Sequence, residues 1–162
     1  MPTLIKTKIL VKAALSNRKD QSGVPLYEHC VRVSVNMAQL LKKYKITDEL
    51  NDYIHVALLH DVLEDSDLTE DDLHMFGYNN KTIDAVKLLT HDKKDVSYSD
   101  YIENLCQSQN LMALLGKLSD NMDNTCINRH SLLNEKSREY FKIRYAGVRE
   151  KLEEAIAKCL AQ

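Results

Sequence analysis

The sequence predicts an all-α fold, a single compact helical bundle spanning residues 1–162. Two observations favour this class. Only four glycines and two prolines punctuate the chain, so few positions force a turn. Apolar residues recur at steps of three and four along most of the sequence, which is the spacing of a helix face, and strand-like alternation does not compete with it. The length lies within the usual range of one domain.

Composition narrows the classes of function. A net charge of -2 and a pI near 6.3 provide no broad positive field, so nucleic acid is not expected as a partner. We expect no membrane partner and a cytoplasmic location, because no apolar run could span a bilayer and the first residues lack the order of a secretory signal. The four cysteines are widely spaced and are expected to be reduced. Homo-oligomerisation stays open.

The first part of the chain predicts three helices. The first runs from about Thr3 to Ser16, and a polar loop follows over residues 17–25. The third is expected to begin with Thr47 as its N-cap and to end its apolar stripe on Asp61. The second carries an inward-facing stripe formed by His29, Val33, Met37, Leu40 and Tyr44.

The rest of the chain predicts five further helices. Thr69 should cap a short helix that Gly77 ends, and residues 81–90 should form another. Ser97 or Ser99 opens the next helix, which reaches about residue 107. Asn110 caps a longer helix to about residue 126, and a final helix runs from residue 134 or 135 toward residue 160.

The string His60-Asp61-Val62-Leu63-Glu64-Asp65 places four ionisable residues beside apolar ones. On a continuous helix His60 and Glu64 are neighbours, and so are Asp61 and Asp65. Buried carboxylates and imidazoles are costly unless they are paired or bound to a metal, so a cation would explain the cluster. The alternative is a helix end that reaches solvent, with the last acids in a surface turn.

A second polar cluster is predicted around Asp120. Lys117, Asp120 and Asn124 share one helix face, and Gly116 would leave space for a ligand to approach. Taken alone, Asp120 is also explained as a residue that faces water, and His29 as a core histidine.

Two imidazoles and two carboxylates would form a mixed nitrogen and oxygen ligand set, which suits Mn²⁺, Fe²⁺ or Zn²⁺ better than Ca²⁺. A divalent cation polarises a phosphoryl oxygen and lowers the pKa of bound water from about 15.7 toward neutrality. Glu64 and Asp65, one turn beyond the ligands, would accept the proton of that water or orient its attack. The candidate ligands are His29, His60, Asp61 and Asp120.

The order of these residues resembles the HD phosphohydrolase superfamily, whose signature is a His, a His-Asp pair and a distal Asp. Longer motifs resemble the ppGpp hydrolase domain of the RelA/SpoT family, especially its stand-alone small alarmone hydrolases. The resemblance runs from Arg18 to Tyr140. Ser66 stands where the family more often has Thr, and residues 91–101 depart from the family pattern. The motifs are Arg18-Lys19-Asp20 with Pro25-Leu26-Tyr27-Glu28-His29, the string from His60 to Ser66, and Leu118-Ser119-Asp120 with Asn124.

The resemblance implies an HD-domain bundle that hydrolyses ppGpp or pppGpp with one Mn²⁺ ion, releasing pyrophosphate from the ribose 3′ position and leaving GDP or GTP. It implies that the four candidate ligands hold the metal and that Glu64 and Asp65 handle the water. For the guanine nucleotide, it implies that Arg18 stacks on the base and that Lys19 lines the site. Asn124 would contact the ribose or a phosphate. Tyr140 would close the pocket, unless it is a core aromatic residue.

Two other functions are open. One keeps the HD centre but acts on another nucleotide or on NADPH, and the guanine contacts of Arg18 and Lys19 would distinguish it. The other is a helical regulatory module without turnover, which predicts a damaged ligand set or a missing general base. The sequence shows neither defect.

Overall fold

The computed structural model describes residues 1–20, 22–131 and 133–161. In these residues the regular structure is helical, apart from one isolated bridge between Lys19 and Pro25, and the predicted all-α class is confirmed. The helices are α1 (Leu4–Ala14), α2 (Leu26–Lys43), α3 (Leu50–Leu59), α4 (Val62–Asp65), α5 (Glu70–Met75), α6 (Asn80–Leu89), α7 (Tyr98–Gln107), α8 (Leu111–Asn124), α9 (Ile127–His130), α10 (Glu135–Arg144) and α11 (Val148–Leu160).

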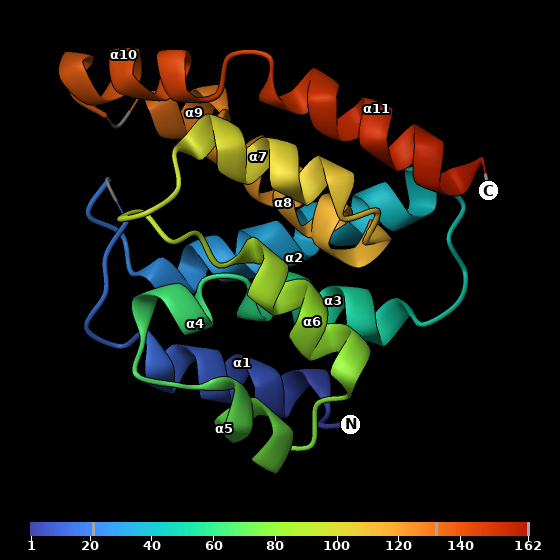
Figure 1. The fold of residues 1–162 in the computed structure, drawn as a ribbon. Helices are drawn as coiled ribbons and strands as arrows, with labels where there is room; N and C mark the ends of the chain where they lie inside the picture. Colours follow the sequence, from blue (N-terminus) through green and yellow to red (C-terminus); the bar gives the residue numbers. More distant parts are fainter. Residues whose placement is uncertain (21, 132, 162) are drawn as a thin grey trace.

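Helix α8 is the central element of the bundle. It packs against α2, α3, α6, α7 and α11, and α2 also packs along α3 (Figure 1). Helices α10 and α11 lie at one end of the molecule and α1 and α5 at the other (Figure 1). The central helices α2, α3 and α8 therefore bring residues near 30, 60 and 120 into one region, although they are far apart in sequence.

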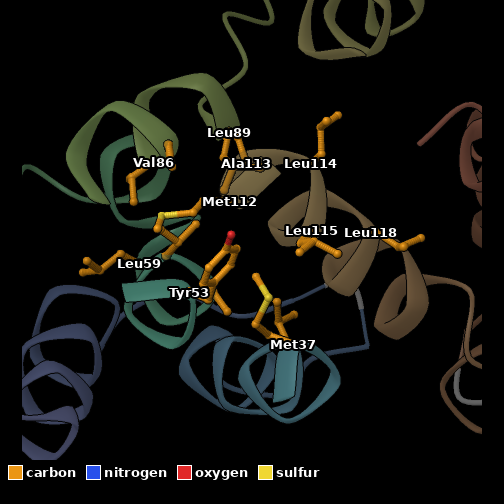
Figure 2. Packing of buried hydrophobic residues seen from close by; sticks show 14 of the residues in the cluster. Met37, Tyr53, Leu59, Val86, Leu89, Met112, Ala113, Leu114, Leu115 and Leu118 are labelled. Atoms are coloured by element: carbon orange, nitrogen blue, oxygen red, sulfur yellow. The ribbon is translucent and has the colours of Figure 1, made fainter. Parts of the chain in front are cut away.

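The core forms where the apolar faces of these helices meet. Figure 2 shows buried side chains that several helices contribute to this core, among them Met37 of α2, Leu59 of α3, Leu89 of α6 and Leu115 of α8. Leu115 and Leu59 are fully excluded from solvent. Burying a side chain of this size contributes about 1.5–3 kcal/mol, so this packing fixes the positions of the helices that carry the polar groups described below.

Several predicted helix ends are confirmed. Thr69 caps α5 in a capping box with Asp72, and Gly77, at φ +89°, follows its end. Ser97 and Asn110 cap α7 and α8 through side-chain hydrogen bonds to backbone amides. Asparagine and serine oxygens thus satisfy amides that the helices themselves leave unpaired.

Two predicted helix bounds are wrong. The third helix begins at Leu50 rather than after Thr47, because Glu49 adopts a left-handed conformation at φ +53° immediately before it. The final helix begins after Asn134, as predicted, but it is interrupted where Gly147 adopts φ +70°, so α10 and α11 are separate helices. The short helix α9 was not predicted.

The predicted continuous helix through residues 60–65 is also wrong. Helix α3 ends at Leu59, and a turn at His60 and Asp61, where Asp61 has φ -98° and ψ -3°, precedes α4. Nor does Gly116 leave room for a ligand. A Cβ atom there would lie 2.8 Å from Leu89 Cδ1, so the glycine allows α8 to approach α6 closely.

No described helix combines the length and apolar character that a membrane span requires.

Candidate metal centre and active site

The structure brings the four predicted ligands together at the centre of the bundle. His29 comes from α2, His60 and Asp61 from the turn between α3 and α4, and Asp120 from α8. The Nε2 atoms of His29 and His60 lie 3.2 Å apart. Asp120 Oδ1 lies 3.1 Å from His29 Nε2, and Asp61 Oδ2 lies 3.2 Å from His60 Nε2. All but Asp61 are buried.

The hydrogen bonds of the two imidazoles indicate which nitrogen carries the proton. His60 Nδ1 lies 2.9 Å from the carbonyl oxygen of Ala57, which can only accept a hydrogen bond. His29 Nδ1 lies 2.7 Å from Asp123 Oδ2. In each neutral ring the proton therefore sits on Nδ1, and the lone pair of Nε2 is directed at the other histidine.

These donors fit a divalent cation. Two Nε2 lone pairs that face each other at 3.2 Å repel unless a proton or a cation lies between them. Ligand atoms at about 2.0–2.2 Å from one ion are separated by about 3–4 Å, which matches the 3.1 to 3.8 Å separations found among these side chains. Two overlapping groups of side chains have their ligand atoms close enough together to hold one metal ion. The first is His29, His60 and Asp120, and the second is Cys30, His60 and Asp61.

Opposite charges control the pKa values of this cluster. Burial lowers the pKa of His29, but hydrogen bonds to Asp120 and Asp123 outweigh it and raise the pKa to about 9. Burial raises the pKa of Asp61 and Asp120, but His60 beside Asp61 and Lys117 beside Asp120 hold both below the ordinary value. Both carboxylates are therefore ionised at neutral pH, as a metal ligand must be.

Asp123 is a supporting residue that the sequence did not reveal. Its carboxylate accepts a hydrogen bond from His29 and two more from Arg32, at 2.8 and 3.1 Å. Two spacings could have indicated it, since Arg32 lies one turn after His29 on α2 and Asp123 lies one turn after Asp120 on α8. The arrangement orients the imidazole of a candidate metal ligand.

A cavity of about 330 Å³ opens onto the candidate ligands. Its lining includes five carboxylates and three cationic side chains, so the pocket is acidic unless a divalent cation balances it. The acids are Asp20, Asp61, Glu64, Asp65 and Asp120, and the cations are Lys93, Lys117 and Arg144.

Glu64 and Asp65 both line this cavity. Glu64 accepts a hydrogen bond from the backbone amide of His91 at 3.0 Å and pairs with Lys93 at 2.5 Å, so its carboxylate is held in one orientation. Burial, followed by the negative charges of Asp61 and Glu64, raises the pKa of Asp65. A raised pKa makes a carboxylate a better proton acceptor.

The four predicted nucleotide contacts fall into two pairs. Asn124 and Tyr140 line the cavity. The Nδ2 amide of Asn124 donates to Asp120 Oδ1 at 2.5 Å. Arg18 and Lys19 are not among the lining residues. Arg18 instead donates through Nε to the backbone oxygen of Asp65, at 2.8 Å, which places it beside α4.

One wall of the cavity is built from α7, α8 and α10. Lys117 of α8 donates to Asp120 Oδ2 at 2.8 Å, and its ammonium lies 5.7 Å from the ring centre of Tyr98. The hydroxyl oxygen of Tyr98 and Nδ1 of His91 are buried and have no hydrogen-bond partner among the described residues. Because buried polar atoms are normally satisfied, this wall is suited to a polar ligand.

A solved structure of a metazoan ortholog of SpoT that hydrolyzes ppGpp and plays a role in starvation responses is similar to this chain. The two chains share 25% identity with a TM-score of 0.73, and the match covers 100% of this chain and 97% of that one. No family model matches the sequence, and no curated protein matches it.

The likeness confirms the predicted fold and the predicted resemblance to HD-domain ppGpp hydrolases. Together with the histidine and aspartate cluster, it supports a phosphohydrolase with a divalent metal ion as the class of protein.

Proposed function

We propose that this protein hydrolyses ppGpp and pppGpp with the help of one divalent cation, Mn²⁺, releasing pyrophosphate from the ribose 3′ position and leaving GDP or GTP. The observation that carries the proposal is the pair of facing Nε2 atoms of His29 and His60, flanked by the carboxylates of Asp61 and Asp120. The full-length likeness to a ppGpp-hydrolysing ortholog of SpoT supports this choice of substrate.

The reaction consumes one water. Its oxygen forms a bond to the phosphorus atom attached to the 3′ oxygen, and the bond between that phosphorus and the 3′ oxygen breaks. The 3′ oxygen takes up a proton and becomes the 3′ hydroxyl of the product. A divalent cation held by the four ligands would supply Lewis acidity toward the phosphoryl oxygens and would lower the pKa of water. Asp65, whose pKa is raised by burial, accepts the proton that the water loses. Glu64, fixed by the His91 amide, orients that water.

Other residues of this chain position the substrate and the ligands. Lys117 neutralises Asp120 at the edge of the cavity, which lowers the repulsion between that carboxylate and an incoming phosphate. Asn124 contacts the ribose or a phosphate from the cavity wall, and Tyr140 closes the pocket. Arg18, held beside Asp65, and Lys19 contact the guanine from the loop that precedes α2.

The test is a comparison of substrates. Metal-stripped protein is given Mn²⁺, and product release is measured from ppGpp, GTP, dNTPs and NADPH in parallel. Fast Mn²⁺-dependent release of pyrophosphate from ppGpp alone would support the proposal. Faster turnover of NADPH or another nucleotide would support the metal-dependent mechanism but show that ppGpp is not the preferred substrate. No turnover of any of them would favour a regulatory module.

A further inference from the structure

Arg144 is a cavity residue that neither the motifs nor the proposed reaction uses. It is the last residue of α10, and its side chain lines the same cavity as the candidate metal ligands. Its guanidinium lies over the ring of Tyr98, 3.8 Å from the ring centre, and one of its nitrogens donates to the hydroxyl of Tyr140 at 2.8 Å. Stacking of this kind fixes a guanidinium while leaving other donors at its edge available.

No acid among the described residues neutralises the charge of Arg144. Lys93 pairs with Glu64, and Lys117 pairs with Asp120. Arg144 forms no ion pair with a described carboxylate. Burial lowers the pKa of its guanidinium, but the neighbouring Tyr145, Tyr140 and Tyr98 outweigh burial and raise that pKa. Among the described cations that line the cavity, Arg144 therefore has the charge best able to attract an anionic group.

The position of Arg144 indicates which anionic group it contacts. Asp120 faces His29 with one oxygen and Lys117 with the other. Lys117 in turn lies 5.7 Å from the centre of the Tyr98 ring on which Arg144 stacks. The contacts from Arg144 through Tyr98 and Lys117 to Asp120 separate Arg144 from the metal ligands, and this separation favours contact with a second phosphate rather than with the phosphate that reacts there.

We propose that Arg144, stacked on Tyr98, binds the 5′-diphosphate of the nucleotide while the 3′-diphosphate lies at the metal ligands. This inference rests on the proposed function, because it needs a substrate with phosphates on both sides of the ribose. Guanidinium groups bind phosphate through paired hydrogen bonds. The residue therefore selects for nucleotides that carry a 5′-diphosphate.

The kinetic test uses Arg144→Gln, which removes the charge and keeps a long polar side chain. We expect the KM for ppGpp to rise about 10- to 100-fold, the effect of losing one charge-assisted hydrogen bond, with kcat nearly unchanged. The KM for guanosine 3′-diphosphate, which lacks the 5′ phosphates, should not change. Arg138→Gln, on the exposed side of the same helix, is the matched control. An equal rise in KM for both substrates would overturn the proposal.

A measurement of GDP affinity tests the role of Arg144 independently of whether the protein hydrolyses ppGpp. GDP carries the 5′-diphosphate and no 3′ phosphate, so its affinity for the Mn²⁺-loaded protein requires no turnover. Arg144→Gln should weaken binding of GDP, but not of guanosine, about 10- to 100-fold. This result would support the role of Arg144 even if ppGpp were not hydrolysed. Unchanged GDP affinity would overturn the role even if ppGpp were hydrolysed. If Arg144→Gln fails to fold, Arg144→Lys, which keeps the charge without the planar fork, should show a smaller loss in the same assay.

Discussion

The contacts made by Nδ1 determine what each central histidine can do. His60 is oriented by a backbone carbonyl, whereas His29 is oriented by the carboxylate of Asp123. A carboxylate raises the basicity of an imidazole ligand more than a carbonyl does, and Arg32 holds that carboxylate in place. Metal affinity should therefore depend on a residue that does not itself touch the metal.

Asp123→Asn tests this dependence. The asparagine keeps the shape but loses the charge that orients His29, so we expect Mn²⁺ affinity to fall about 10- to 100-fold while the protein stays folded. Calorimetric titration of the metal-stripped variant measures the affinity. Asp84→Asn, at an exposed position on α6, is the control and should match the wild type. Wild-type affinity in Asp123→Asn would contradict the orienting role.

Substitution of Glu64 should reduce turnover without reducing Mn²⁺ affinity. Because it lies in the cavity but is not one of the four ligands, Glu64→Gln should bind Mn²⁺ normally and lose turnover by a factor of about 10²–10⁴. Activity and Mn²⁺ binding are measured on the same preparation. Asp67→Asn, an exposed acid of the same segment, should retain full activity. Loss of Mn²⁺ binding in Glu64→Gln would instead make Glu64 a ligand.

Among the elements, the interruption between α3 and α4 matters most for the site. The turn at His60 and Asp61 presents both side chains to the same cavity as His29 and Asp120. Asp61 keeps a right-handed helical conformation and directly precedes α4. Away from the cavity, a buried hydrogen bond between the hydroxyl of Thr7 and Nδ1 of His55 joins α1 to α3. The same hydroxyl is also hydrogen-bonded to the hydroxyl of Tyr78.

This contact predicts a pH dependence of stability. Burial lowers the pKa of His55 below 6.5, although Asp52 acts in the opposite direction. The folded state therefore binds the proton more weakly than the unfolded state. The resulting stabilisation is fully present above pH 6.5, and it is lost as the pH falls through the folded-state pKa.

Urea unfolding of the wild type and His55→Asn at several pH values checks this sign. The free-energy difference between the two proteins should shrink as the pH falls below about 6.5, because only the wild type carries this titrating group. His74→Asn, at an exposed histidine on α5, should keep the wild-type pH dependence. A difference that stays constant with pH would rule out the contribution of His55.

Helix caps were more predictable than interruptions. Four residues act as caps because each side chain accepts a hydrogen bond from the amide only three residues later, which is local information: Thr69, Ser97, Asn110 and Asn134. The turn at residue 60 lacks such a signal. Its geometry depends on packing between α3, α6 and α8, which apolar spacing along one segment does not specify.

At the scale of the whole molecule, α8 connects the core to the site. Its apolar face packs against α2, α3 and α6, while its polar face carries Lys117, Asp120 and Asn124 to the cavity. The order of the candidate metal ligands was visible in the sequence. Asp123 was missed because its role depends on the packing of α8 against α2, which brings it to His29. Tyr98 and Arg144 were missed because their positions depend on where α7 and α10 lie relative to α8 (Figure 1).

We propose that one divalent cation is held by four residues from separate parts of the chain, His29, His60, Asp61 and Asp120. A cation that binds only the folded arrangement also stabilises the whole bundle. Calorimetric titration of the metal-stripped protein with Mn²⁺ tests the claim most directly, with His60→Ala as the variant and His74→Ala as the control. We predict one Mn²⁺ per chain in the wild type and the control, and none in His60→Ala at the same concentrations. Equal Mn²⁺ binding in His60→Ala and the wild type would contradict the account.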